Sequence, residues 1–384
     1  MPKNKSESEE YEEEEEEEEI VMPPIKGKTQ TFQYFDLSKD ARKLLCNSMV
    51  MYGESGDGKS YIANNILYEL SPYINIVFVF CPTARVDKSF PMVEYSSPSF
   101  VYETLDMQKI KAIMEFGRDR AAMLRQIEDI DSLKRTTKEF IIPFYKSVNE
   151  DRILNRTLKI YNKINKLVKK FDYKNTPKME RDRFNSDIVR YYRLILYDCK
   201  KYLHKNKIRI PPKYKALALP VLFHDIKPNN VVITNDFGDA LGALKKDDAT
   251  IASELVMKER HYNITTIHLV QNVNQIKKCD RAQIKVNMFL SPTTISSYIS
   301  TLGLKGPAKK KLEEAAEYIL SADRNRAVRK YPVVLYFKLE EKVMYTYADT
   351  KLDFERIGNV KLYEALDGLV MDHTENNPLS NIFS

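Results

Sequence analysis

The sequence predicts an α/β protein in which a mostly parallel sheet lies between helices. Apolar runs of strand length recur at 48–52, 74–81, 230–235, 264–270 and 285–290. Segments with helical spacing of apolar residues lie between them, at 59–70 and 241–260. A glycine-rich loop joins the first strand to the first helix. Such alternation is typical of a parallel sheet that is covered on both faces.

The first strand leads into a motif for phosphate binding. Residues 46–60 read CNSMVMYGESGDGKS, followed by an apolar-periodic helix. Glycines allow the backbone to wrap around phosphate oxygens, and the start of the helix presents free N–H groups to them. Lys59 would neutralise the outer phosphates and Ser60 would ligate Mg²⁺. We therefore expect the phosphates of a nucleotide to be bound by Gly53, Glu54, Ser55, Gly56, Asp57, Gly58, Lys59 and Ser60.

A second motif, FHDIKPNNVVITNDFGD at 223–239, has two interpretations. Its His-Asp, Asn and Asp-Phe-Gly elements look like a protein-kinase catalytic loop. Only VVITN separates Asn230 from Asp236, however, which is too short for the two strands and the turn that a kinase needs there. The favoured interpretation is a buried parallel strand, VVIT, that delivers Asn235 and Asp236 to a magnesium ion at the phosphate loop.

Charge is distributed unevenly along the chain. The first 20 residues hold eleven Glu and two Lys, which gives them a net charge of −9. Because the whole chain has a net charge of +7, the remaining residues carry +16. Residues 109–215 contain 29 Lys and Arg against 13 Asp and Glu, which is also +16. Residues 1–27 are expected to be a disordered acidic tail, and 351–384 a C-terminal tail.

Residues 109–215 are predicted to form a basic helical insertion built around a long hairpin that turns at YKNTPKMER. One of its helices has basic residues at steps of three and four, which form a straight stripe about 27 Å long. Like charges at this spacing repel each other. The stripe is therefore either a solvated surface or a contact for a polyanion such as double-stranded DNA. Its members are Arg152, Arg156, Lys159, Lys163, Lys166 and Lys170.

The insertion would divide a P-loop ATPase core into 28–108 and 216–350. YPVVLYF at 331–337 and KVMYTYA at 342–348 predict an antiparallel hairpin added at an edge of the sheet. The longest apolar runs are too short to span a membrane. Four scattered cysteines and a polar N-terminus favour a reducing, intracellular location rather than secretion.

Four stretches together resemble a known family. They are GESGDGKS, NIVFVFCPT, VVITNDFGDAL, and KERHYNITTIHLVQNV followed by DRAQIKVNMFLS. In order and spacing they are similar to the genome-packaging ATPases of large eukaryotic DNA viruses, the poxvirus-type branch of the FtsK–HerA superfamily. The resemblance covers 46–100 and 220–300. The acidic tail and the basic insertion have no matching counterpart.

The resemblance implies a P-loop NTPase with a RecA/FtsK-like sheet. It implies a homo-oligomeric ring that hydrolyses ATP with Mg²⁺ and pushes double-stranded DNA into a preformed capsid. Its partner would be a capsid or vertex protein, in the virus factory of the host cytoplasm or in the virion. By position, Asp236 would polarise the attacking water and Gln271 would sense the γ-phosphate. Arg260, or alternatively Arg281, would reach a neighbour's nucleotide as an arginine finger.

One residue departs from the family pattern, because Asn235 stands where an Asp usually holds magnesium. Hard cations prefer carboxylate oxygens. Either Asp236 serves the metal, or metal affinity is weaker, or the chain binds nucleotide without turnover. Two further functions stay open: an FtsK/HerA-like DNA pump or helicase in repair or segregation, and a nucleotide-binding structural vertex protein.

Overall fold

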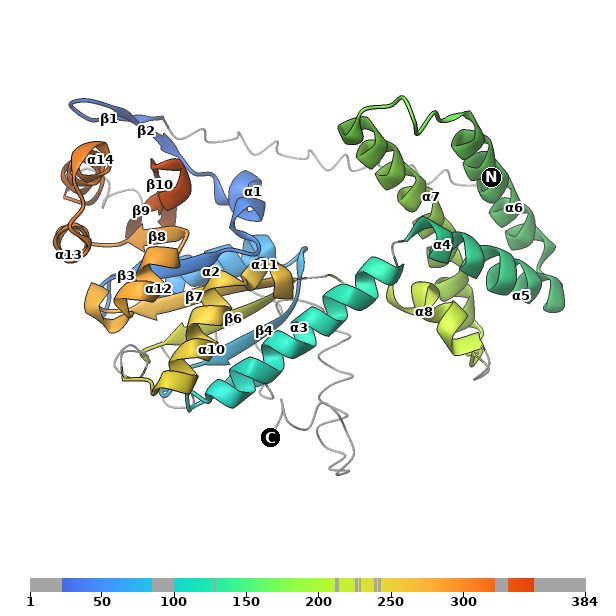
Figure 1. Ribbon diagram of the computed structural model, residues 1–384, viewed down its shortest axis with the longest axis horizontal. Helices are drawn as coiled ribbons and strands as arrows, with labels where there is room; N and C mark the ends of the chain where they lie inside the picture. Colours follow the sequence, from blue (N-terminus) through green and yellow to red (C-terminus); the bar gives the residue numbers. More distant parts are fainter. Residues whose placement is uncertain are drawn as a thin grey trace, which may run out of the picture.

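The computed structural model describes residues 23–84, 100–127, 129–210, 214–224, 227, 229–237, 240, 243–321 and 331–348. A ten-stranded sheet with helices on both faces forms one part of the molecule, and an all-helical unit stands beside it (Figure 1). The α/β fold class predicted from the sequence is confirmed.

The predicted strands lie within one residue of their expected bounds, whereas three short strands were not predicted. The three unpredicted strands have two to four residues and no continuous apolar run that would mark them in the sequence. The strands are β1 (Ile25–Lys26), β2 (Thr31–Tyr34), β3 (Ser48–Tyr52), β4 (Ile74–Phe80), β5 (Val101–Tyr102), β6 (Asn229–Asn235), β7 (Ile264–Val270), β8 (Val286–Phe289), β9 (Tyr331–Phe337) and β10 (Lys342–Ala348).

The sheet has the order β1-β2-β10-β9-β8-β3-β7-β6-β4-β5. From β8 to β5 all neighbours are parallel, and β7 lies between β3 and β6. Parallel strands place their carboxyl ends at one edge of the sheet, so Tyr52, Asn235 and Val270 end together. The β9–β10 hairpin is antiparallel, as predicted. It is not an edge, however, because β2 pairs with β10 and β1 pairs with β2.

Helices fill the connections between the strands. They are α1 (Leu37–Asp40), α2 (Lys59–Leu70), α3 (Met107–Ile127), α4 (Ile130–Thr136), α5 (Ile142–Ser147), α6 (Asp151–Lys170), α7 (Lys178–Lys205), α8 (Lys215–Phe223), α10 (Lys246–Met257), α11 (Glu259–Tyr262), α12 (Lys278–Gln283), α13 (Pro292–Leu302) and α14 (Gly306–Ala315). Shorter helical turns are η1 (Ala41–Leu44), η4 (Thr137–Ile141), η6 (Val273–Gln275), η7 (Ala316–Leu320) and η9 (Lys338–Glu340).

Strand β3 shows how the sheet divides the core. Met49 and Met51 pack into the cluster under α2, whereas Val50 and Tyr52 pack into the cluster under α3, α10, α13 and α14. The period of two is that of a strand buried on both faces. Because β3 is packed on both faces, the position of the loop that follows Tyr52 is fixed relative to the sheet.

The all-helical unit has a core of its own. Buried side chains from Leu133 to Val221 form a third cluster, contributed by α4 to α8. Helix α3 packs instead on the sheet through Ile110 and Ile113. The unit therefore begins after α3 and includes α8, whereas the sequence suggested 109–215. The hairpin of α6 and α7 agrees with the predicted turn.

The α3 helix is joined to the sheet by Arg120, whose side chain is only 7% exposed. Its guanidinium donates to Asn230 Oδ1 at 2.9 Å and to the carbonyl oxygen of Lys227. With its amide oxygen toward the guanidinium, Asn75 also accepts at 2.8 Å. The helix that leads into the helical unit and the segment that returns from it thus meet at one buried side chain.

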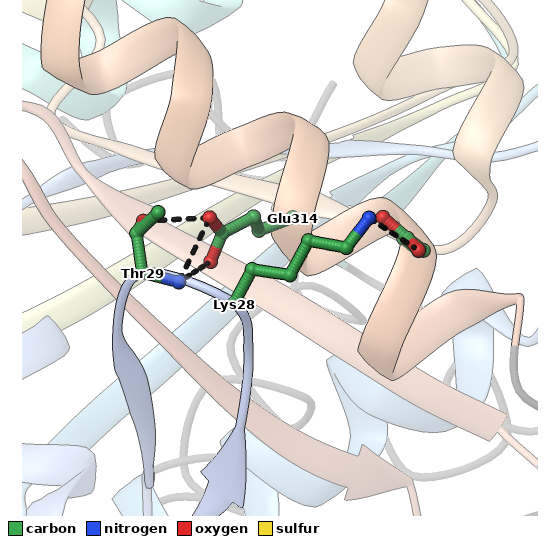
Figure 2. Close-up of polar contacts among 4 residues, drawn as sticks. Lys28, Thr29 and Glu314 are labelled. Atoms are coloured by element: carbon green, nitrogen blue, oxygen red, sulfur yellow. Dashed lines mark hydrogen bonds and ion pairs between the residues drawn. The ribbon is translucent and has the colours of Figure 1, made fainter.

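The first strands are fixed to α14 by Glu314 (Figure 2). Its carboxylate accepts the Thr29 hydroxyl at 2.6 Å and the Thr29 N–H at 3.1 Å. These bonds hold the pKa of Glu314 below its usual value. A Cβ at Gly27 would lie 2.7 Å from Glu314 Oε2, so a larger residue would displace the carboxylate. Lys28 adds an exposed ion pair with Glu317 at 3.4 Å.

Several predictions concern residues outside those described. They include residues 1–22 of the acidic tail, the C-terminal tail 351–384, and the Gly238-Asp239 pair of the second motif. The tail was predicted to extend to residue 27, but Ile25–Lys26 form β1. No helix among the described residues has the length and apolar character needed to cross a membrane.

Candidate nucleotide-binding site

The loop between β3 and α2 has the backbone of a phosphate cradle. Gly56 and Gly58 have φ values of +86° and +93°, which favour glycine. Helix α2 begins at Lys59, directly after Gly58, so its first N–H groups open into the loop. The Glu54 N–H donates to Asp57 Oδ2 at 2.6 Å. Glu54, Ser55 and Gly56 form the exposed rim of this loop.

Lys59 is the buried cation of the cradle. Its Nζ donates to Gly53 O at 2.7 Å and to Glu54 O at 2.8 Å. Burial lowers the pKa of Lys59, and the carboxylates of Asp236, Asp57 and Glu54 oppose this shift. Among the described residues no carboxylate lies within ion-pair distance of the ammonium. A buried cation held only by neutral carbonyls is suited to exchange them for an anion such as phosphate.

Asn235 and Asp236 follow β6 at the same edge of the sheet. Asn235 is 5% exposed, and its Nδ2 donates to Asp236 Oδ2 at 3.2 Å and to Cys81 Sγ at 3.5 Å. Asp236 is exposed and has a φ of +57°. Its carboxylate is close enough to Lys59 to raise the pKa of the ammonium, against the effect of burial. The structure thus brings the second motif to the phosphate loop.

Gln271 follows β7, the strand between the other two. It is exposed, and its N–H donates to Gln275 Oε1 at 2.8 Å. Gln275 belongs to η6, where it also completes a capping box with Asn272. The Gly53 N–H donates to Val270 O at 3.2 Å, which joins the start of the phosphate loop to the residue before Gln271.

The donor set suits Mg²⁺ bound together with phosphates. Ser60 is half-buried in the first turn of α2, and Asp236 and Asn235 supply a carboxylate and an amide at the end of β6. Magnesium usually takes one or two protein oxygens and completes its octahedron with phosphate oxygens and water. Three such groups at one edge of the sheet would therefore suffice to hold the ion beside a bound nucleotide.

The two candidate arginine fingers differ in position. Arg260 is exposed on α11, which precedes β7, so it stands at the edge of the sheet opposite the phosphate loop. It lines a cavity of about 450 Å³ there. Arg281 is 6% exposed and donates to Val273 O at 2.8 Å and to Asn274 Oδ1 at 3.3 Å. Arg281 therefore braces the turn after Gln271, whereas Arg260 is exposed, and the choice of Arg260 over Arg281 as the finger stays a prediction.

Sequence reasoning missed two neighbours of the phosphate loop. Cys81, at the end of β4, accepts from Asn235. Tyr331, the first residue of β9, lies against Gly58 and stacks on Tyr61. Tyr331 is more than 270 residues from the loop in the chain, and no spacing rule connects them. Only the order of strands could have placed it there.

The helical unit presents a second candidate surface. All six basic residues of the stripe on α6 are exposed, as the helical spacing suggested. One stripe residue has an acidic partner that is distant in the sequence: Arg156 forms an ion pair with Asp198 of α7 at 3.1 Å. Lys163 lies over the Tyr191 ring at 4.5 Å. Lys159, Lys166 and Lys170 have no ion-pair partner within the part of the chain that the structure describes.

No family model and no curated protein matches this chain. Similar solved structures include the DNA-packaging ATPase B204 from Sulfolobus Turreted Icosahedral Virus, with 12% identity, a TM-score of 0.34, and coverage of 78% of this chain and 96% of that one. The pCW3 conjugation coupling protein TcpA shares 11% identity at a TM-score of 0.37, over 93% of this chain and 73% of that chain. The plasmid coupling protein TrwB shares 12% identity at a TM-score of 0.33, over 86% and 92%.

With TM-scores below 0.4, the fold rests on this chain's own order of strands. The sheet is parallel in the order β8-β3-β7-β6-β4, with the glycine-rich loop after β3 and Asp236 after β6, which is the arrangement that the sequence predicted for a phosphate-binding α/β fold.

Proposed function

We propose that this chain is an ATP-driven translocase that packages viral double-stranded DNA into a preformed capsid. One observation carries the proposal. Strand β6 has Asp236 at its carboxyl end, within electrostatic range of Lys59, and near its amino end Asn230 is hydrogen-bonded to Arg120 of the helix that leads into the basic helical unit. A site suited to hydrolysis and a surface suited to a polyanion are therefore attached to the two ends of one buried strand.

At the nucleotide, each residue has a distinct role. Lys59 would leave its carbonyl partners and bind the outer phosphates, while the N–H groups of the loop hold the inner ones. Asp236 would accept a proton from the attacking water, and Gln271 would contact the γ-phosphate. Mg²⁺, when bound near Ser60 and the Asn235–Asp236 pair, would offset the charge that develops on the phosphate oxygens.

At the helical unit, the exposed lysines of α6 would bind DNA phosphates. Such contacts release counterions and do not read sequence, as a motor that moves along any duplex requires. The position of Arg260, at the edge opposite its own phosphate loop, fits a role at a neighbouring subunit's nucleotide. A ring of copies would bring Arg260 of one subunit to the phosphate loop of the next.

Turnover on DNA tests this function. We expect purified protein to release phosphate from ATP faster when linear duplex DNA is present, and to displace a triplex-forming strand from that DNA only while ATP is hydrolysed. A rate of ATP hydrolysis that does not change when DNA is added would contradict the proposal of a DNA motor. The packaging role requires in addition that the protein occupies a single vertex of the particle, which an image of labelled particles would reveal.

One observation favours a second candidate, a nucleotide-binding vertex protein without turnover. Asn235 has a neutral amide where a carboxylate would hold magnesium more tightly. Nucleotide binding with no phosphate release, with or without DNA, would support that candidate. A DNA pump or helicase acting in repair or segregation would pass the triplex test but would be absent from particles.

A further inference from the structure

Two tyrosines form a stacked pair beside the phosphate loop. The rings of Tyr61 and Tyr331 have centroids 5.2 Å apart and an interplanar angle of 19°. Tyr61 lies in the first turn of α2, two residues after Lys59, and Tyr331 is the first residue of β9. Both are half-buried and pack on the cluster under α2. The pair therefore keeps an apolar aromatic surface partly open to solvent near the loop.

Tyr331 is fixed against the backbone of the loop itself. A Cβ at Gly58 would lie 2.5 Å from the Tyr331 ring, closer than side-chain contacts allow. Gly58 also has a φ of +93°, so glycine is required there both by conformation and by the ring. This close approach gives Tyr331 a defined position relative to the phosphate cradle.

The groups around the loop are divided between its two sides. Asp236 and Gln271 follow β6 and β7, on one side of β3. Tyr331 begins β9, which lies beyond β8 on the other side of β3. The γ-phosphate belongs where Asp236 and Gln271 can reach it. The nucleoside of the same nucleotide must then leave the cradle in the opposite direction, toward the tyrosines.

We propose that Tyr331, supported by Tyr61, forms the platform on which the nucleobase of the bound nucleotide stacks. The proposal rests on nucleotide binding at the phosphate loop, as in the function proposed above. The ligand class is a planar base joined to a polyphosphate. Aromatic stacking on a base typically changes affinity by about five- to a hundredfold.

The chain offers a direct probe because it contains no tryptophan. Tyr331→Trp would create a single indole beside the loop. We expect ATP to quench its fluorescence, because the base would stack on the indole. Inorganic tripolyphosphate fills the same cradle without a base, so it should bind with little quenching. Equal quenching by both ligands would show that the indole senses only the loop, and would overturn the proposal.

Affinity gives an independent test. Calorimetry on Tyr331→Ala should show ATP binding weakened by about five- to a hundredfold and tripolyphosphate binding unchanged within about twofold. Tyr331→Phe, which keeps the ring, should bind both ligands as the parent does. If Tyr331→Ala weakens both ligands equally, or neither, the base does not stack there. If the parent chain binds neither ligand, the proposed function itself fails, which is a different result.

Discussion

Arg120 on α3 donates to Asn230 Oδ1 of β6 at 2.9 Å from a buried position. The charge has no carboxylate partner among the described residues, and burial lowers the pKa of Arg120 to about 10. A buried guanidinium that is satisfied only by amide and carbonyl oxygens is kept in place by geometry rather than by charge pairing. Its position joins the sheet to both ends of the helical unit.

Arg120→Met should destabilise the chain strongly. The substitution removes the donors and leaves buried acceptors on Asn230 and Lys227 without partners, which costs at least about 2 kcal/mol. Denaturant unfolding measures the loss. Arg118→Met on the same helix is the matched control, because Arg118 is exposed and forms only a surface pair with Asp119. Similar losses in both variants would show that the Arg120 contacts contribute little.

Stability should rise with pH between about 4 and 6.5 because of His268. Its Nδ1 lies 2.8 Å from Thr234 Oγ1, and burial lowers the pKa of His268 to about 4. An unfolded histidine titrates near 6.5, so in this window the unfolded chain binds the proton and the folded chain does not. The free energy of unfolding should therefore fall by up to about 3 kcal/mol as the pH decreases through the window.

His268→Gln should flatten this part of the pH profile, since glutamine does not titrate. His261→Gln, at an exposed histidine on α11, should leave the slope intact. The comparison uses unfolding free energies at several pH values. An identical slope in the parent and in His268→Gln would contradict the role of the buried imidazole.

The Asn235–Asp236 pair should separate metal binding from water activation. If Asn235 stands at the metal, Asn235→Asp adds a carboxylate and should lower the Mg²⁺ concentration that gives half-maximal ATP turnover. Asp236→Asn should then reduce turnover by about 10²–10⁴-fold while nucleotide still binds. If Asp236 is the metal ligand, Asp236→Asn should instead raise the Mg²⁺ requirement. Turnover measured against Mg²⁺ assigns the pair, and no change in either variant would exclude β6 from the site.

The exposed lysines of α6 should control DNA affinity without changing nucleotide affinity. Reversing Lys159, Lys166 and Lys170 to Glu should weaken duplex binding and reduce its salt dependence by up to about 0.9 log unit per lost contact. These three are chosen because Arg156 and Lys163 have partners on α7. The control reverses three exposed lysines outside the helical unit, Lys246, Lys305 and Lys310. Equal effects in both sets would indicate a general response to charge.

The sequence predicted those parts of the fold whose pattern is local. Strands such as β3 and β7 are continuous apolar runs, and the period of α6 is visible over five turns. Strand β5 is too short to show a pattern, and β2 joins the main sheet by pairing with β10. The sequence analysis therefore placed the edge of the sheet at the β9–β10 hairpin, because pairing between strands that are distant in the chain is not visible in the residues of either strand.

The candidate site also contains some residues that local motifs predict and others that only tertiary packing places. The phosphate loop and Asp236 lie in motifs whose residue types and spacing predict contact with a nucleotide. Arg120 looked like one more cation in a basic segment, and only tertiary packing distinguishes it from the solvated residues around it. Arg281 was considered as a finger because of its motif, yet its side chain turns inward to Val273 O. Motifs specify residue types, whereas side-chain direction depends on packing.

ATP hydrolysis by Lys59→Ala tests the central claim most directly. Lys59 is the buried cation of the proposed phosphate site, and its ammonium donates to the carbonyl oxygens of Gly53 and Glu54. The account predicts that the variant unfolds at nearly the parent temperature and releases phosphate from ATP at less than about one hundredth of the parent rate. A folded Lys59→Ala protein that hydrolyses ATP at the parent rate would contradict it.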